Sequence, residues 1–151
     1  MASILLIDDT ASVLAALDYC LKTMGYEIHL AGDGRKGLQL AAEHVPDLIM
    51  LDLEMPLMNG VAVCRSLKAD PVLKRIPVLM MTGQATQEAR RQALAAGAIV
   101  VMSKPFDLEV LEATVARCIT EAGGTPPALG HASILGVETA AAPAPSPPTA
   151  G

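Results

Sequence analysis

Residues 47–60 read DLIMLDLEMPLMNG, and the first half of this stretch sets the fold class. Asp47–Leu51 is a short, mostly apolar run, and Asp52 stands directly after it. A run of this length and composition is typical of a parallel strand that is covered on both faces. The stretch therefore predicts a buried strand that delivers an aspartate to its carboxyl end.

Four more runs of the same kind occur on either side of this one, and helical patterns separate them. The five predicted strands are Ser3–Ile7, Glu27–Ala31, Asp47–Leu51, Pro77–Met81 and Ala98–Met102. In the first helical pattern, 13–24, apolar residues recur at spacings of three and four. Leu38, Leu40 and Ala41 indicate a second helix that ends before Pro46, and three more helices are predicted over 61–69, 87–96 and 108–121. Five strand–helix units predict an α/β fold, a doubly wound parallel sheet with helices on both faces.

In such a sheet the ligand site lies at the carboxyl ends of the strands. Polar side chains stand there in this sequence: Asp8, Asp9, Asp52, Thr82 and Lys104. Three converging carboxylates resist joint ionisation unless a cation lies among them, and oxygen ligands without His or Cys favour Mg²⁺. A lysine and a threonine beside an aspartate can clamp an anion, and aspartate can accept a phosphoryl group as an acyl phosphate.

Each of these residues also has an ordinary structural interpretation. A single aspartate after a strand is usually a helix cap or a turn residue, and Lys-Pro is commonly a turn. The functional hypothesis therefore depends on the conjunction of all five residues at the strand ends.

Residues 3–121 resemble a response-regulator receiver domain of two-component signalling, as in the chemotaxis response regulator. The resemblance depends on Ile7-Asp8-Asp9, Leu51-Asp52-Leu53-Glu54-Met55-Pro56-Leu57-Met58-Asn59-Gly60, Met81-Thr82-Gly83 and Lys104-Pro105-Phe106. It implies a flavodoxin-like (βα)5 three-layer sandwich with strand order 2-1-3-4-5.

The resemblance also implies roles for individual residues. Asp52 would be the phosphoacceptor, and Thr82 and Lys104 would contact the phosphoryl group. Mg²⁺ or Mn²⁺ would be held by Asp9, by Asp52, by the backbone carbonyl of Glu54 and, through a water, by Asp8. Structural roles at the site would fall to Pro56, Gly60, Gly83 and Pro105, with a cis Lys104–Pro105 peptide bond.

One position departs from the family pattern. Receivers usually carry Tyr or Phe three residues before the lysine, as an aromatic switch, and here that residue is Val101. The missing aromatic side chain does not affect the predicted phosphorylation of Asp52. It puts in question the route by which phosphorylation would change the conformation. The signal would then pass through the 82–88 loop or through repacking of smaller side chains.

The predicted function is a signalling switch that is not an enzyme beyond promoting its own phosphorylation and dephosphorylation. A histidine kinase or phosphotransfer protein would supply the phosphoryl group, and a downstream protein would bind the face of the fourth and fifth helices. Two alternatives remain open: a non-phosphorylated interaction module of the same fold, and an aspartyl-phosphate phosphatase of the haloacid-dehalogenase type. In that phosphatase class the nucleophile normally follows the first strand.

Composition limits the remaining possibilities. The 151 residues carry a net charge of −5, which argues against direct DNA binding through phosphates. No apolar run approaches the length of a membrane span, and the N-terminus lacks a signal peptide pattern. Three widely spaced cysteines favour a reduced, cytoplasmic protein. We expect a receiver domain over 1–121 and a flexible Ala/Pro/Gly-rich tail or linker over 122–151, in either a stand-alone receiver or a piece of a longer chain.

Overall fold

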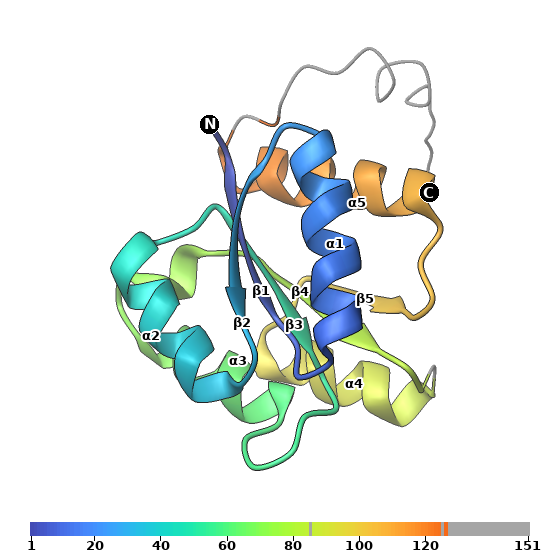
Figure 1. Ribbon diagram of the computed structural model, residues 1–151. Coiled ribbons are helices and arrows are strands. Elements are labelled where there is room, and N and C mark those ends of the chain that lie inside the picture. The colour runs from blue at the N-terminus through green and yellow to red at the C-terminus, as the bar shows by residue number, and fades with distance from the viewer. Residues whose placement is uncertain (85, 125, 127–151) are drawn as a thin grey trace, which may run out of the picture.

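Strands and helices alternate strictly along the chain (Figure 1). The computed structural model describes residues 1–84, 86–124 and 126. The strands are β1 (Ser3–Ile7), β2 (Glu27–Ala31), β3 (Leu48–Asp52), β4 (Val78–Thr82) and β5 (Val100–Ser103). The helices are α1 (Ala11–Thr23), α2 (Gly34–His44), α3 (Gly60–Ala69), α4 (Gln87–Ala96) and α5 (Leu108–Glu121), with a short 3₁₀ turn at Leu73–Arg75.

The five strands form one parallel sheet in the order β2-β1-β3-β4-β5. The register pairs Ile7 with Leu51, Asp52 with Met81, and Thr82 with Ser103, so the carboxyl ends of β1, β3, β4 and β5 lie side by side. The predicted α/β class and the predicted strand order are both confirmed.

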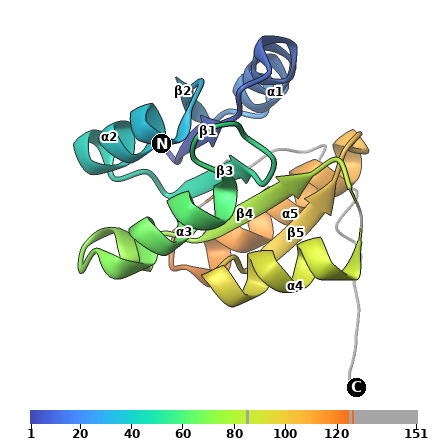
Figure 2. The ribbon, with the colours of Figure 1, turned by 90° about the horizontal axis from the view of Figure 1, so that it is seen from below.

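The sheet separates two apolar cores, with α1 and α5 on one face and α2, α3 and α4 on the other (Figures 1 and 2). Successive residues of a strand point to opposite faces. In β1, Ile4 and Leu6 therefore pack toward α1 and α5, whereas Leu5 and Ile7 pack toward α2 and α3. This double coverage explains why the central strands read as nearly continuous apolar runs.

The last three strands begin and end later than predicted. The strand β3 covers 48–52 instead of 47–51, β4 covers 78–82 instead of 77–81, and β5 covers 100–103 instead of 98–102. Pro77 has no N–H to donate to the ladder, and the amide of Ala98 donates to Ala93 at the end of α4 instead. Asp52 and Thr82 are therefore the last residues of their strands rather than the first residues after them.

Helix boundaries follow capping residues that are visible in the sequence. Asn59 accepts a hydrogen bond from Ala62 N at the start of α3, and Asp107 accepts two from the first turn of α5. Gly97 ends α4 with a positive φ of 115°. None of the helices in the described part of the chain is both long and apolar enough to cross a bilayer. Most of the predicted tail, 122–151, lies outside the described residues.

Candidate functional site

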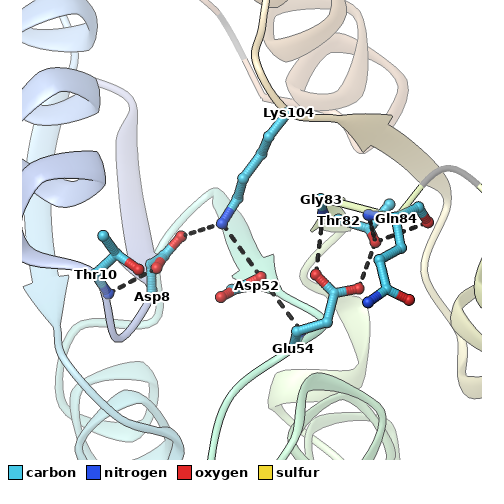
Figure 3. Close-up of polar contacts among 8 residues, drawn as sticks. All are labelled: Asp8, Thr10, Asp52, Glu54, Thr82, Gly83, Gln84 and Lys104. Carbon is cyan, nitrogen blue, oxygen red and sulfur yellow. Dashed lines mark hydrogen bonds and ion pairs between the residues drawn. The ribbon is translucent and has the colours of Figure 1, made fainter.

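The polar residues predicted to meet at the carboxyl edge of the sheet do meet there, and Figure 3 draws all of them except Asp9. Asp8 and Asp9 follow β1, Asp52 ends β3, Thr82 ends β4, and Lys104 follows β5. One carboxylate oxygen from each of Asp8, Asp9 and Asp52 lies within 4.8 Å of the other two. Asp8 and Asp52 are buried, and Asp9 is exposed.

These three carboxylates fit a hard divalent cation. Their donor set consists of oxygens alone, which suits Mg²⁺ or Mn²⁺ better than metals that prefer nitrogen or sulfur. The exposed Asp9 leaves one side of the cluster open to water, and Mg²⁺ usually retains several waters in protein sites. Among the described residues, this acidic cluster is the group with the spacing to hold a metal ion.

The surroundings of Asp52 make its charged form costly. Burial, reinforced by the neighbouring Asp8 carboxylate, raises the pKa of Asp52 from 3.8 to about 6. The contact with Lys104 and the hydrogen bond from Glu54 N to Oδ1, at 3.3 Å, act in the opposite direction and limit the rise. A cation or a further positive group at this place would therefore be stabilising.

Lys104 connects the two buried aspartates. Its Nζ lies 2.8 Å from Asp8 Oδ2 and 3.3 Å from Asp52 Oδ1. Burial disfavours the ammonium, but the hydrogen bond to Asp8 and the charges of both aspartates together raise the pKa of Lys104 above its usual value. The backbone of Lys104 is fixed by its N–H, which donates to Thr82 O at 2.8 Å, and the Lys104–Pro105 peptide bond is cis.

Thr82 lies in a second group of contacts, formed with the loop that follows β3. Its hydroxyl donates to Glu54 Oε2 in a short hydrogen bond, and Gly83 N donates to Glu54 Oε1 at 3.0 Å (Figure 3). Gln84 N donates to Thr82 Oγ1 at 3.0 Å. The sequence indicates that Glu54 flanks the site, but it does not predict these contacts of the Glu54 side chain with Thr82 and Gly83. The available signal was an acidic residue two positions after the strand-end aspartate.

The β3–α3 loop turns back closely on the strand that precedes it. Gly60 N donates to Leu53 O at 3.0 Å, and a Cβ added to Gly60 would collide with the backbone of Asp52 and Leu53. Pro56 and Leu57 form the exposed tip, where Leu57 has a positive φ of 67°. Gly60 is therefore required by the close approach of the two backbone segments.

Val101 occupies the place where the resemblance implies an aromatic side chain. It is buried on β5, on the side of the sheet that α4 covers. A cavity of about 110 Å³ lies next to it, lined by Thr82, Thr86, Gln87, Arg90, Val101 and Ser103. The smaller side chain thus leaves open space between the end of β4 and α4.

Comparison with known proteins places this chain in a family. The model of the response regulator receiver domain matches residues 4–116. The chain is 38% identical over 135 residues to the DNA-binding dual master transcriptional regulator RpaA of Synechocystis, and 40% identical over 114 residues to the response regulator PleD of Caulobacter vibrioides. These alignments cover 89% and 76% of this chain, which spans 56% of RpaA and 25% of PleD.

Solved structures agree with the sequence comparison. The chemotaxis protein CheY4 of Vibrio cholerae is 33% identical, with a TM-score of 0.75 over 78% of this chain and 98% of that protein. The receiver domain of the sensor histidine kinase PA1611 from Pseudomonas aeruginosa is 28% identical, with a TM-score of 0.74 over 79% of this chain and 98% of that one. That structure has a magnesium ion coordinated in its active-site cleft. The chain therefore belongs to the response regulator receiver domain family.

Proposed function

We propose that this receiver domain is a phosphorylation switch in which Asp52 accepts a phosphoryl group from a histidine kinase or a phosphotransfer protein. The observation that supports it most is the position of Lys104 Nζ, which contacts Asp8 and Asp52 at once within the cluster of three carboxylates. A lysine held beside a buried aspartate is placed to neutralise the oxygens of a group attached to that aspartate.

In the proposed transfer, an Asp52 carboxylate oxygen forms a bond to the phosphorus of a phosphohistidine. The P–N bond breaks at the same time, and its electron pair stays on the imidazole nitrogen of the donor. With a pKa of about 6, Asp52 is mostly ionised at neutral pH, as this attack requires. Lys104 would exchange its contact with Asp52 for one phosphoryl oxygen, and the Thr82 hydroxyl would donate to another.

The proposed metal ligands are Asp9, Asp52, the backbone carbonyl of Glu54 and, through a water, Asp8. A bound Mg²⁺ or Mn²⁺ would supply positive charge where carboxylate and phosphoryl oxygens gather. The protein's own contribution is to hold these oxygens in place, through the backbone hydrogen bonds from Thr10 N to Asp8 Oδ1, at 2.9 Å, and from Glu54 N to Asp52 Oδ1.

Phosphorylation would shift the protein toward a second conformation of α4, β5 and α5, to which a downstream protein binds. Leu94 on α4 and Ile99 before β5 are apolar and exposed, which supports protein binding on this side of the molecule. The net charge of −5 supports a protein partner over direct contact with DNA. The free thiols of all three cysteines are consistent with a cytoplasmic location.

The test is the intact mass of the protein after incubation with acetyl phosphate and Mg²⁺. We expect the wild type to gain one phosphoryl group and Asp52→Asn to gain none. Asp70→Asn, which changes an aspartate in the turn after α3, serves as the matched control and should gain the group. A wild type without the added mass, or a gain that survives Asp52→Asn, would contradict the proposal. Steady turnover of phosphomonoesters would favour the phosphatase instead.

A further inference from the structure

The carboxylate of Glu54 binds the start of the β4–α4 loop with both of its oxygens. Oε2 accepts from the Thr82 hydroxyl, and Oε1 accepts from the backbone N–H of Gly83 at 3.0 Å (Figure 3). Thr82 is buried, whereas Glu54 lies on an exposed loop and covers it from outside. An anionic group from the β3–α3 loop is therefore attached to the two residues that end β4 and begin the next loop.

The Thr82 hydroxyl cannot serve this carboxylate and a phosphoryl group together. A threonine hydroxyl has one hydrogen to donate, and its oxygen already accepts from Gln84 N at 3.0 Å. Gln84 O, at 3.1 Å from Thr82 Oγ1, is a neutral acceptor for the same hydrogen beside the Glu54 carboxylate. In the proposed function this hydrogen is donated to a phosphoryl oxygen. Whichever anion holds the hydroxyl excludes the other from it.

The two anions are also close enough to repel each other. Glu54 is two residues from Asp52, and its own N–H donates to Asp52 Oδ1 at 3.3 Å. A phosphoryl group on Asp52 adds negative charge beside a carboxylate that is already bound to Thr82 and Gly83. Like charges in a partly buried place raise each other's free energy, so one of them must move away.

We propose that Glu54 is a latch: its carboxylate holds Thr82 and Gly83 in the non-phosphorylated protein and is displaced when Asp52 is phosphorylated. The inference rests on the proposed function and names how the site is regulated. Glu54 acts through Thr82 and is a positioning residue. When the Glu54 carboxylate is released, Thr82 and Gly83 lose the contacts that hold them beside the cavity at Val101. The start of the β4–α4 loop can then move, and this movement requires no aromatic side chain at residue 101.

The latch makes phosphorylation less favourable, since its hydrogen bonds must be broken first. A hydrogen bond to a charged group contributes more than one between neutral groups, enough to change an affinity by a factor of about ten. We therefore expect removal of the Glu54 carboxylate to strengthen the binding of a phosphoryl mimic by about tenfold.

The probe is beryllofluoride with Mg²⁺, titrated by NMR into the wild type, Glu54→Gln, Glu54→Ala and Glu43→Gln. Both Glu54 variants should bind more tightly, with alanine showing the larger effect because glutamine still offers Thr82 one acceptor. Glu43 is an exposed carboxylate near the end of α2 that contacts Gln39 and His44, so Glu43→Gln controls for the change in net charge. This control should match the wild type.

A double-mutant cycle separates a latch from simple charge repulsion. In a Thr82→Ala background, Glu54→Ala should strengthen beryllofluoride binding by clearly less than in the wild type, because the hydrogen bond is already gone. Before any beryllofluoride is added, the amide signal of Gly83 should shift upfield in Glu54→Ala and keep its position in Glu43→Gln.

The outcomes distinguish this inference from the function on which it rests. If the wild type does not bind beryllofluoride, both the proposed function and the latch are refuted. If the wild type binds and the Glu54 variants bind equally well, the function stands and the latch is refuted. The latch would also be refuted if Glu54→Ala strengthened beryllofluoride binding equally in the wild type and in the Thr82→Ala background. That result would show that charge repulsion alone explains the effect.

Discussion

Replacing the buried carboxylate at residue 52 should stabilise the metal-free protein while abolishing its proposed chemistry. Asp52 is buried beside Asp8, and its charged form is disfavoured there. In Asp52→Asn a neutral amide of nearly the same shape takes its place, and its oxygen can still accept from Glu54 N. The folded protein then no longer holds a second negative charge next to Asp8.

The magnitude follows from the pKa of Asp52, which is 3.8 ordinarily and about 6 in the folded protein. This difference corresponds to a penalty of about 3 kcal/mol for folding with the ionised group. Between these two values the folded protein binds more protons than the unfolded chain, so its stability falls as the pH rises. The penalty is absent below about pH 3.8 and complete above about pH 6.

Urea unfolding in EDTA, followed by circular dichroism from pH 4 to pH 7.5, measures this effect. Relative to the wild type, Asp52→Asn should gain stability as the pH rises and reach an advantage of about 2–3 kcal/mol at pH 7.5. Asp18→Asn, which changes the half-buried aspartate of an ion pair with the exposed Lys22, should alter stability by less than about 1 kcal/mol. An Asp52→Asn variant that is less stable than the wild type at pH 7.5, or an advantage independent of pH, would refute the reasoning.

Three further substitutions test other parts of the site. Lys104→Met should slow phosphoryl incorporation from acetyl phosphate about a hundredfold, because it removes the cation that contacts Asp8 and Asp52; a rate within threefold of the wild type would contradict its role. Gly60→Ala should lower the free energy of unfolding by more than about 2 kcal/mol, because its Cβ would collide with the Asp52 backbone; a chemical unfolding curve measures this. Val101→Phe should cost less than about 1 kcal/mol in the same assay, since the neighbouring cavity can receive the ring, whereas overpacking a filled core costs about 1–3 kcal/mol.

The strands β1 and β2 have the predicted bounds, and among the helices the ends were predicted correctly where the sequence has clear start or stop signals. Gly97 ends α4 and Asp107 begins α5, and both helices have the predicted bounds. The strands β3, β4 and β5 were predicted one or two residues too early, because polar residues at their ends still pair in the sheet. Apolar patterning detects burial, and it does not detect the backbone ladder that continues through Asp52 and Thr82.

The site was predictable to the extent that the fold alone brings strand ends together. Asp8, Asp52 and Lys104 each stand at such an end, and parallel strands place those ends at one edge. The contact between Glu54 and Thr82 was not predictable in this way. It depends on the path of the β3–α3 loop, which turns at Leu57 with a positive φ and returns at Gly60. Strand and helix periodicity contains no information about where a loop side chain points.

The ion pair between Asp8 and Lys104 joins residues that are 96 positions apart in the sequence. Contacts over such separations form slowly, because the intervening chain must be ordered before the contact can be made. A nascent chain that ends before β5 has its three aspartates but no Lys104 to neutralise them. Competence for phosphorylation would thus arise only once the edge strand has docked, and acetyl phosphate labelling could serve as a reporter of completed folding during synthesis.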